Sequence, residues 1–452
     1  MQFISPWITQ LNGTYSAVPV SENLKSDVAI VGGGISGVCT AYFTLKNTDL
    51  NVVLIEGNKI AHAATGHNAG QLVCHFEKNT LDLIREFGLD LTIDAYSSVH
   101  SAWDLLDEIY KDTDLKTSYS QFIGYDGCDG LEQILRHLEN KMLCRQAGIA
   151  ILPVLIAKES EIATKIPEKF KMLYSLVPQK KILKLLEIQD KNYIAVNCIK
   201  KGCMNSALFC EELITYLLKK YSDRFALYEN SHVKNISLEK SEAVLTVGEH
   251  NVTATKVVLC TNGYKNFSIT NNGGNNIESV FKKSIRGLVG HMYGYLEQSD
   301  KLPTAIAYEQ VRNYAGNDIY HADPYYYVTR RPYVSKEGPY NLVCIGGAET
   351  KLENNSEYNR SYPYSEEARI SLQQFLAKNY ENSLTSIKSF VWHGLLGYTQ
   401  NGIRYIGADP SNSSLLYNLG CNGVGILPSI YGGSKISRIL SGERQEKSIF
   451  DP

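Results

Sequence analysis

Three glycines near the N-terminus have the spacing of a dinucleotide-binding loop. Val28–Val31 is a short apolar run rich in β-formers, and it leads directly into Gly32-x-Gly34-x-x-Gly37. In such a loop the first glycine permits a tight turn, the second lets the backbone approach a pyrophosphate, and the third lets the next helix pack closely on the strand. The start of that helix then offers free N–H groups and a positive dipole end to the phosphates.

A carboxylate follows at the place where the adenosine ribose of a dinucleotide would lie. The predicted helix runs through Leu45, and a second apolar strand, Val52–Ile55, ends at Glu56. A carboxylate at this point can accept hydrogen bonds from both ribose hydroxyls. Strand, glycines, helix, strand and acid therefore predict a dinucleotide site at the start of the chain.

A second glycine cluster opens a helix near the C-terminus. The run Gly420-Cys-Asn-Gly423-Val-Gly425-Ile-Leu-Pro428 precedes a predicted helix, Ser429–Leu440. Its N-terminus is another positive dipole end, suited to a second centre of negative charge. A flavin has such a centre at its N1–C2=O edge, which becomes anionic on two-electron reduction. Two helix starts therefore favour FAD over NAD, whereas the second cluster alone also fits a surface turn before a terminal helix.

The composition predicts a soluble protein of two domains. The chain has 452 residues, 44% hydrophobic content and a formal net charge of −2, which argues against nucleic acid as a main partner. No apolar run approaches the ~18–20 residues that span a bilayer, and Met1–Pro6 lacks the features of a signal peptide. The ten cysteines are scattered singly, without metal-ligand spacing. We therefore expect reduced thiols, no metal and a cytoplasmic location.

The order of several motifs resembles the D-amino acid oxidase/glycine oxidase superfamily of FAD enzymes. Besides the two glycine runs, the motifs are Ala64-Thr-Gly-His-Asn-Ala-Gly70, Val257-Val-Leu-Cys-Thr-Asn-Gly263 and Ile345-Gly-Gly-Ala-Glu349. The first and second of these are most similar to the gamma-glutamylputrescine oxidase-like branch. The resemblance extends from about Asp27 to Gly442.

This resemblance implies an α/β fold of mixed α+β character. A Rossmann-like FAD-binding domain, with the glycine motif in its first βαβ unit, would adjoin a substrate domain built on a mixed, largely antiparallel β-sheet. The FAD domain would be discontinuous, comprising roughly 1–90, 197–266 and 391–452. Residues 91–196 and 267–390 would form the substrate domain.

The resemblance also implies which residues hold FAD. The N-terminal glycine run would surround the pyrophosphate, Glu56 would bind the ribose, Val233 would contact adenine through its backbone, and the C-terminal glycine run would meet the flavin pyrimidine. The implied ligands are Gly32, Gly34, Ile35, Ser36, Gly37, Glu56, Gly57, Thr65, Gly66, Asn68, Gly70, Gln71, Leu72, Val233, Thr261, Gly263, Gly397, Gly423, Val424, Gly425 and Ile426.

The chemistry implied is oxidation of an amine C–N bond. Hydride transfer to flavin N5 would give an imine, water would hydrolyse it, and dioxygen or another electron acceptor would reoxidise the flavin. Desolvation against aromatic walls would favour the neutral amine. Our candidates for the pocket are Tyr326 and Trp392, together with four candidate catalytic residues, His291, Tyr293, Tyr327 and Arg330.

Residues that are missing favour an amine over an α-amino acid. D-amino acid oxidases bind the substrate carboxylate with an arginine in a Trp-x-Gly-x-Arg run, whereas this chain reads Trp392-His-Gly-Leu-Leu396. Sarcosine-oxidase-like enzymes use an arginine and a lysine where this chain has Gly70 and Leu427, and they attach flavin to a cysteine at the place of Leu396. A carboxylate buried against leucine would cost several kcal/mol. We therefore expect non-covalent FAD and a primary or secondary amine such as an acylated polyamine, with any carboxylate of the substrate held remotely by Arg330 or Arg331.

Three alternatives remain open. An amino-acid oxidase or dehydrogenase acting on a D-amino acid, glycine or an N-methyl amino acid would have the same fold. A non-catalytic FAD-binding protein is the second, because the expected ring contacts are backbone groups. A reductase that uses NAD(P)H is disfavoured, because Gly124–Gly130 lacks the Gly-x-Gly spacing, preceding strand and trailing acid of a second dinucleotide fold.

Overall fold

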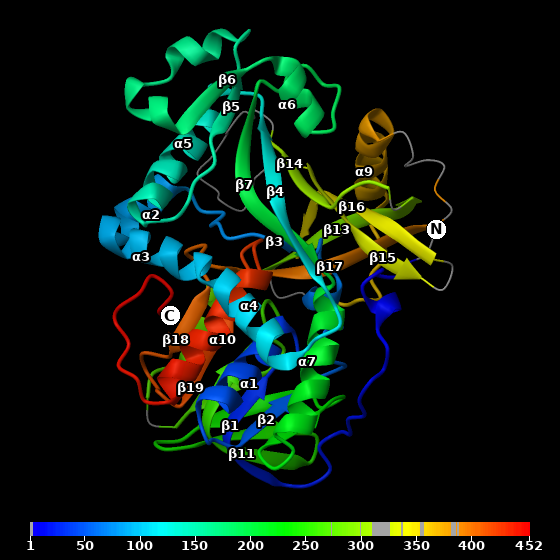
Figure 1. Ribbon diagram of the computed structural model, residues 1–452. Coiled ribbons are helices and arrows are strands. Elements are labelled where there is room, and N and C mark those ends of the chain that lie inside the picture. The colour runs from blue at the N-terminus through cyan, green and yellow to red at the C-terminus, as the bar shows by residue number, and fades with distance from the viewer. Residues whose placement is uncertain are drawn as a thin grey trace.

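The computed structural model arranges the chain around two β-sheets that lie one above the other in Figure 1. The structure describes residues 3–272, 274–298, 300–309, 326–335, 338–352, 357–380, 386 and 388–452.

The lower sheet has a parallel centre. Strand β1 pairs in parallel with β2 and β11, β2 pairs in parallel with β8, and β11 pairs in parallel with β19. The two apolar runs predicted as strands form β1 and β2, and their last four residues are buried, as parallel strands covered on both faces require. The strands of this sheet are β1 (Leu24–Val31), β2 (Val52–Ile55), β8 (Phe225–Tyr228), β9 (Val233–Leu238), β10 (Ala243–Val247), β11 (His250–Leu259), β12 (Ser268–Asn271), β18 (Tyr405–Ala408) and β19 (Leu415–Leu419).

The upper sheet is mixed and largely antiparallel. Its strand order is β17-β13-β16-β15-β14-β4-β7-β5-β6, with β3 paired to β7, and only the β14–β4 and β5–β6 pairs among these described strands are parallel. The strands are β3 (Gln71–Leu72), β4 (Tyr119–Cys128), β5 (Val154–Ala157), β6 (Tyr174–Val177), β7 (Ala195–Met204), β13 (Ile285–Gln298), β14 (Thr304–Tyr308), β15 (Tyr326–Ser335), β16 (Gly338–Lys351) and β17 (Ser389–Thr399).

Helices cover both sheets. In Figure 1, α1, α7 and α10 lie against the lower sheet, α5 and α6 lie around the upper one, and α9 stands on the far side of β13 and β16. The α-helices are α1 (Ile35–Asn47), α2 (Thr80–Phe87), α3 (Leu89–His100), α4 (Ala102–Thr113), α5 (Leu131–Gln146), α6 (Gln179–Leu185), α7 (Ser206–Lys220), α8 (Ile277–Ser284), α9 (Glu366–Asn379) and α10 (Ile426–Leu440). Short 3-10 helices occupy Ile8–Gln10, Ala64–Gly66, Glu161–Lys165 and Glu168–Leu173.

The observed sheets confirm the predicted fold class, and they assign four strands differently from the predicted domain boundaries. Strand β3 lies within the segment 1–90 predicted for the FAD domain but pairs with β7 in the upper sheet. The segments predicted for the FAD domain, 197–266 and 391–452, begin inside β7 and β17, which belong to the upper sheet. Strand β12, predicted for the substrate domain, pairs with β9 in the lower sheet. The order of the motifs predicts which segments contact the cofactor. It does not predict with which strands the first residues of each segment pair, and this pairing determines the sheet to which they belong.

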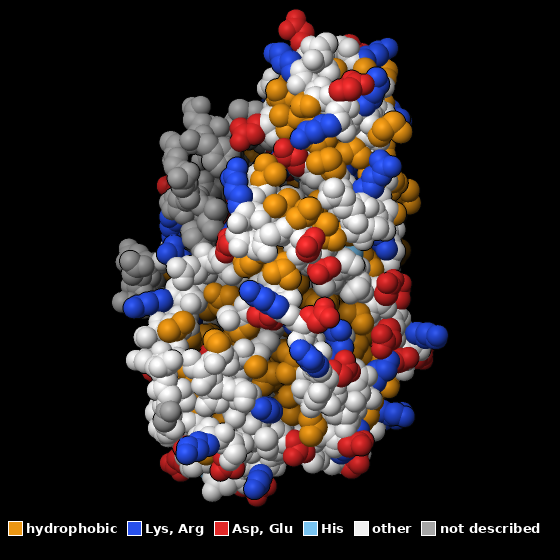
Figure 2. Space-filling model, turned by 90° about the vertical axis from the view of Figure 1, so that its left-hand side faces the viewer, with side chains coloured by type: hydrophobic (Ala, Val, Ile, Leu, Met, Phe, Trp, Pro, Cys, Tyr) orange, Lys and Arg blue, Asp and Glu red, His pale blue; other side chains and the backbone are white. Residues whose placement is uncertain are grey.

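The surface agrees with the near-neutral composition. On the face drawn in Figure 2, acidic and basic side chains are interspersed rather than gathered by sign. Within the ranges that the structure describes, no helix has both the length and the apolar character needed to cross a membrane. All ten cysteines are free thiols.

Candidate active site

The loop between β1 and α1 has the geometry of a phosphate-binding turn. Gly34 is the N-cap of α1 and has no side chain to cap the helix, so the N–H groups of the first turn stay available to an anion. The Ile35 N–H is an exception, because it donates to Thr65 Oγ1 at 3.0 Å. A Cβ at Gly37 would lie 1.9 Å from the carbonyl oxygen of Gly32, so a side chain at this position would break the turn.

Glu56 lies at the end of β2, beside this loop. Its carboxylate accepts the Gly33 N–H at 2.7 Å and the Asn58 N–H at 2.8 Å. Burial raises its pKa, against the opposing effect of these two N–H donors. The carboxylate is thus held by backbone at the edge of the cavity described below, where the sugar of a dinucleotide would reach it.

The start of α10 lies next to the start of α1. Gly425 is the N-cap of α10 and makes no side-chain capping hydrogen bond. Before it, Asn422 and Gly423 have φ values of 44° and 80°, which is the left-handed turn that delivers the chain to the helix. The hydroxyl of Ser36 in α1 lies 3.0 Å from that of Ser429 in α10. Two uncapped helix starts therefore face one region, as predicted for a single cofactor with two centres of negative charge.

A cavity of about 1460 Å³ runs between the two sheets and includes both helix starts. Pockets for a single drug-sized ligand measure about 300–1,000 Å³, so this one has room for a dinucleotide and a second molecule. The predicted FAD residues that line it are Gly32, Gly34, Ile35, Ser36, Glu56, Gly57, Thr65, Asn68, Gly70, Gln71, Val233, Thr261, Gly423, Val424, Gly425 and Ile426. The uncapped helix starts, the acid and the volume fit FAD.

Five predicted FAD residues lie behind the cavity wall. Gly37 packs under the phosphate loop, and a Cβ at Gly66 would meet Ile8 and the carbonyl of Ala61. The others are Leu72, which is fully buried, and Gly263 and Gly397, which pack against each other. These residues support the cavity wall from behind and do not contact the space inside the cavity.

On the side of the cavity nearest the upper sheet, strands β13 and β7 line it with every second residue. On β13 the lining residues are Leu288, Gly290 and Met292. Successive side chains of a strand point to opposite faces, so His291 and Tyr293 point away from the cavity. His291 meets the ring of Tyr364 at 5.1 Å, and burial lowers its pKa to about 4. Tyr293 belongs to the core beneath α9.

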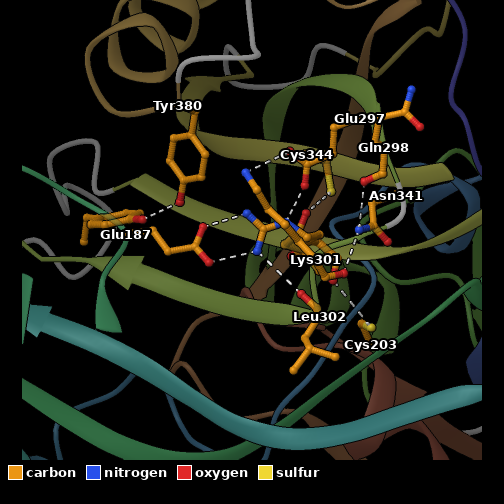
Figure 3. Close-up of polar contacts among 12 residues, drawn as sticks. Glu187, Cys203, Glu297, Gln298, Lys301, Leu302, Asn341, Cys344 and Tyr380 are labelled. Atoms are coloured by element: carbon orange, nitrogen blue, oxygen red, sulfur yellow. Dashed lines mark hydrogen bonds and ion pairs between the residues drawn. The ribbon is translucent and has the colours of Figure 1, made fainter. Parts of the chain in front are cut away.

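Arg330 lies in a buried ion-pair cluster outside the cavity. It is 1% exposed, donates to Glu297 at 2.5 Å and pairs with Glu187 at 2.6 Å. Glu187 and Glu297 are labelled in Figure 3. Arg331 instead lies over the ring of Trp7, with 4.0 Å between guanidinium and ring centre. Neither arginine lines the cavity, so the suggestion that one of them holds a remote carboxylate has no support in this arrangement.

Of the three remaining pocket candidates, two lie outside the cavity and one lines it. Tyr326 stacks on Phe375 of α9 with ring centres 4.4 Å apart, and Trp392 is a buried neighbour of Trp7. Neither lines the cavity. Tyr327, one position further along β15, does line it, and its hydroxyl lies 3.4 Å from the sulfur of Met292. Of the six pocket candidates, Tyr327 is the one that the fold brings to the cavity.

A β-bulge in β16 brings a carboxylate to this cavity. His291 pairs with Ala348, but the next residue, Met292, pairs with Gly346, so Gly347 is an extra residue with a φ of 140°. Without it, Glu349 would fall on the face opposite to the cavity; with it, Glu349 pairs with Gly290 and lines the cavity. Bulges commonly re-aim a side chain beside an active site.

Glu349 is part of an acidic group that sequence reasoning missed. Partial desolvation and the negative charge of Glu77 raise its pKa to about 7. The negative charges of Glu77 and Glu349 also raise the pKa of two nearby phenols, those of Tyr327 and Tyr398. Glu77, Glu349 and Tyr398 all line the cavity. The adjacent glycines of the Ile345-Gly-Gly-Ala-Glu349 motif were the available signal, because a glycine inside a strand often marks a bulge.

Three possible metal ligands also meet, which their spacing in the sequence did not predict. The ligand atoms of Cys128, His137 and Glu309 lie within 4.8 Å of one another. Glu309, however, is held by His137 Nε2 at 3.0 Å and forms an ion pair with Arg136. Burial raises the pKa of Cys128, which keeps the thiol protonated. We therefore assign no metal to this group.

Fold and site together define a flavin-dependent oxidoreductase. The model of the family described as FAD dependent oxidoreductase (DAO) matches residues 27–438, and the chain belongs to this family. The predicted superfamily, enzyme class and FAD cofactor are thereby confirmed.

Two curated relatives match short segments. The chain is 33% identical over 87 residues, 19% of its length, to the putative Rieske 2Fe-2S iron-sulfur protein YhfW of Bacillus subtilis (strain 168), and 32% identical over 71 residues, 16% of its length, to gamma-glutamylputrescine oxidoreductase of Escherichia coli (strain K12). The matched segments span 17% and 16% of these relatives.

Solved structures match over almost the whole chain. Glycine oxidase from Geobacillus kaustophilus has a TM-score of 0.67 at 16% identity, covering 95% of this chain and 98% of its own. L-proline dehydrogenase from P. horikoshii has a TM-score of 0.65 at 15% identity, covering 95% and 97%. At these identities the similarity is one of fold.

Proposed function

We propose that this protein oxidises the C–N bond of a primary or secondary amine, such as an acylated polyamine, with FAD as the electron acceptor. The observation that carries the proposal is the acidic group of Glu349 and Glu77 in the cavity, beside Tyr327 and Tyr398. Carboxylates there attract an ammonium group and repel the carboxylate of an amino acid.

The cations of the cavity wall are engaged elsewhere. Leu396 lines the cavity at the position where D-amino acid oxidases carry an arginine. Four of the lysines and arginines among the described lining residues have partners: Lys78 donates to the Asn401 carbonyl, Arg136 pairs with Glu309, Lys201 pairs with Asp126, and Arg404 donates to Asn418. The charge of the fifth, Arg360, lowers the pKa values of Glu56 and Tyr264, whereas the charge that acts on Glu349 is that of Glu77. A substrate carboxylate beside Glu349 would therefore lack a cation.

The residues of the chain supply binding and proton transfer. Glu349, in its anionic form, binds the ammonium and accepts its proton, which leaves the neutral amine that oxidation requires. Leu288, Met292 and Leu396 provide apolar walls that disfavour the charged amine. FAD, when bound, accepts the hydride from the carbon next to nitrogen. The imine is then hydrolysed by water, and dioxygen or another acceptor removes the electrons.

The test is anaerobic reduction of the bound flavin by a panel of compounds. The panel contains primary and secondary amines, N-acylated diamines, free D-amino acids, glycine and N-methylglycine, and the readout is the loss of visible flavin absorbance. We expect amines to reduce the flavin fastest. Faster reduction by D-amino acids or N-methylglycine would replace the proposal with an amino-acid oxidase, and a flavin that no compound reduces would favour a non-catalytic role.

A further inference from the structure

The cavity continues across the upper sheet, far beyond the acidic group. One row of residues in register crosses six strands, from β13 to β7. The row is Met292, Gly346, Tyr327, Ala307, Asp126 and Asn197, and all of its members except Gly346 line the cavity. In Figure 1 the far end of this row corresponds to β4 and β7, next to α5. The cavity is thus an elongated slot, with the acidic group toward one end.

The far end of the slot holds a buried polar cluster. Lys201 Nζ lies 2.6 Å from Asp126 Oδ1, and Asn197 Nδ2 donates to Asp126 Oδ2 at 2.9 Å. Asn197 is 4% exposed. Because its Nδ2 must face the carboxylate, the orientation of its amide is fixed, and its Oδ1 has no hydrogen-bond partner in the described part of the chain. A buried acceptor without a donor is costly, so this atom points to a ligand that supplies one.

Both carboxylates near that atom are paired, and a further basic group lies close by. Asp126 is paired with Lys201, and Glu309, one residue beyond the end of β14, is paired with Arg136 and His137. Lys141, which is 7% exposed, donates to the carbonyl of Cys198 at 2.9 Å. A cationic ligand group would add to this positive charge in a buried site, and an anionic group has no hydrogen to donate to the oxygen. A neutral group with an N–H donor satisfies the oxygen without adding charge.

We propose that the far end of the slot is a binding subsite for the amide group of a long substrate, held by Asn197, while the amine at the other end is oxidised. The inference rests on the proposed amine oxidation and adds the substrate class. Tyr327 and Asn197 are three strand spacings apart, about 14 Å. An extended chain covers about 3.5 Å in three bonds. A distance of about 14 Å corresponds to about 12 bonds, and to about 8 where hydrogen bonds of about 3 Å at the two ends cover part of it. The substrate therefore has about 8 to 12 bonds between the oxidised amine nitrogen and the amide nitrogen.

The experiment uses the FAD-loaded protein and two matched series of compounds. One series is N-acetyl diamines with about 3 to 11 methylene groups between the nitrogens. The other is simple alkylamines of the same lengths, in which methylenes replace the amide. Calorimetric titration gives the dissociation constant of each compound, and anaerobic flavin reduction gives its rate. In the wild type we expect the amide series to bind about tenfold more tightly than the alkyl series at the longer lengths, and equally at the shortest.

Two variants separate the subsite from general damage. Asn197→Ala removes the acceptor, and we expect the tenfold preference to fall to about twofold or less. Asn379→Ala is the matched control, because Asn379 also carries a buried Oδ1 that has no partner among the described residues, but it lies on α9, outside the cavity. The control should keep the full preference.

The outcomes distinguish the two proposals. Amines that reduce the flavin of the wild type without any preference for length or amide overturn the subsite and leave the oxidation standing. Preferential binding of long amides to a flavin that stays oxidised supports the subsite and overturns the oxidation. A preference that survives in Asn197→Ala overturns the assignment to Asn197, even where that variant is less stable, since the ratio is measured within one protein.

Discussion

The substitution Glu349→Gln tests the acidic group through its pH dependence. The pKa of Glu349 is raised to about 7, so the side chain is anionic above that pH and becomes neutral as the pH falls through it. At pH 8 about nine-tenths of the molecules carry the charge, and at pH 6 about one-tenth do. The wild-type kcat/KM for a cationic amine should therefore fall about tenfold per pH unit below pH 7.

Glutamine keeps the size of the side chain but cannot carry the charge. Loss of a charge-assisted hydrogen bond costs roughly 1.5–3 kcal/mol, which is about tenfold to a hundredfold in kcat/KM. The expected defect is large at pH 8 and small at pH 6, because the wild-type side chain is itself mostly protonated there. The pH profiles of kcat/KM for the wild type and the variant should therefore converge toward low pH. The fall of kcat/KM below pH 7, which we call the acidic limb, should be absent from Glu349→Gln.

Anaerobic stopped-flow reduction of the flavin, measured between about pH 6 and pH 9, gives both profiles. Glu132→Gln is the control, because Glu132 is an exposed carboxylate at the α5 end of the same cavity. The profile of Glu132→Gln should keep the acidic limb of the wild type. If kcat/KM of Glu349→Gln is lowered by the same factor at every pH, or if its profile keeps the acidic limb, the role given to Glu349 is refuted.

Three further predictions concern the cofactor and the core. Glu56→Ala should weaken FAD binding about tenfold to a hundredfold through loss of charge-assisted hydrogen bonds to the ribose; unchanged occupancy after extensive dialysis would show that Glu56 is not the ribose ligand. Acid or heat should release yellow FAD, since Leu396 takes the place of the cysteine that tethers flavin in sarcosine-oxidase-like enzymes, and burial raises the pKa of both thiols that line the cavity, Cys260 and Cys421; flavin left on the precipitated protein would contradict this. Arg330→Met should lower the free energy of unfolding by up to about 3–5 kcal/mol, because the buried Glu297 then keeps only its longer ion pair with the half-exposed Lys301; unchanged denaturant stability together with weaker amine binding would show that Arg330 acts in the substrate pocket.

The cofactor half could be predicted because its signals are local. The turn at Gly32, the packing of Gly37 and the acid at the end of β2 are determined within one βαβ unit of about 30 residues. The start of α10 was also visible, since glycines and Pro428 mark it in the sequence. That α1 and α10 start side by side could not be derived from either helix, because their contact joins residues almost 400 positions apart.

The substrate half could not be predicted because it depends on which face each strand presents. The aromatic runs predicted strands correctly, but His291 and Tyr293 differ from Met292 by one position, and one position reverses the face. Arg330 was a reasonable candidate as a bare cation. Its partners Glu187 and Glu297 lie 143 and 33 residues away in the sequence, so nothing local shows that its charge is already neutralised.

The bulge at Gly347 shows why substrate class does not follow from family membership here. The family match covers residues 27–438, which include the phosphate loop and both helix starts, and these features would serve any substrate oxidised at the flavin. The acidic group depends instead on one extra residue in β16, because without Gly347 the carboxylate of Glu349 would lie on the face that packs against α9. One insertion or deletion at this point would exchange the lining of the cavity without changing the fold. The register of β16 is therefore a better guide to the substrate than overall similarity, which stands at 16% identity to glycine oxidase.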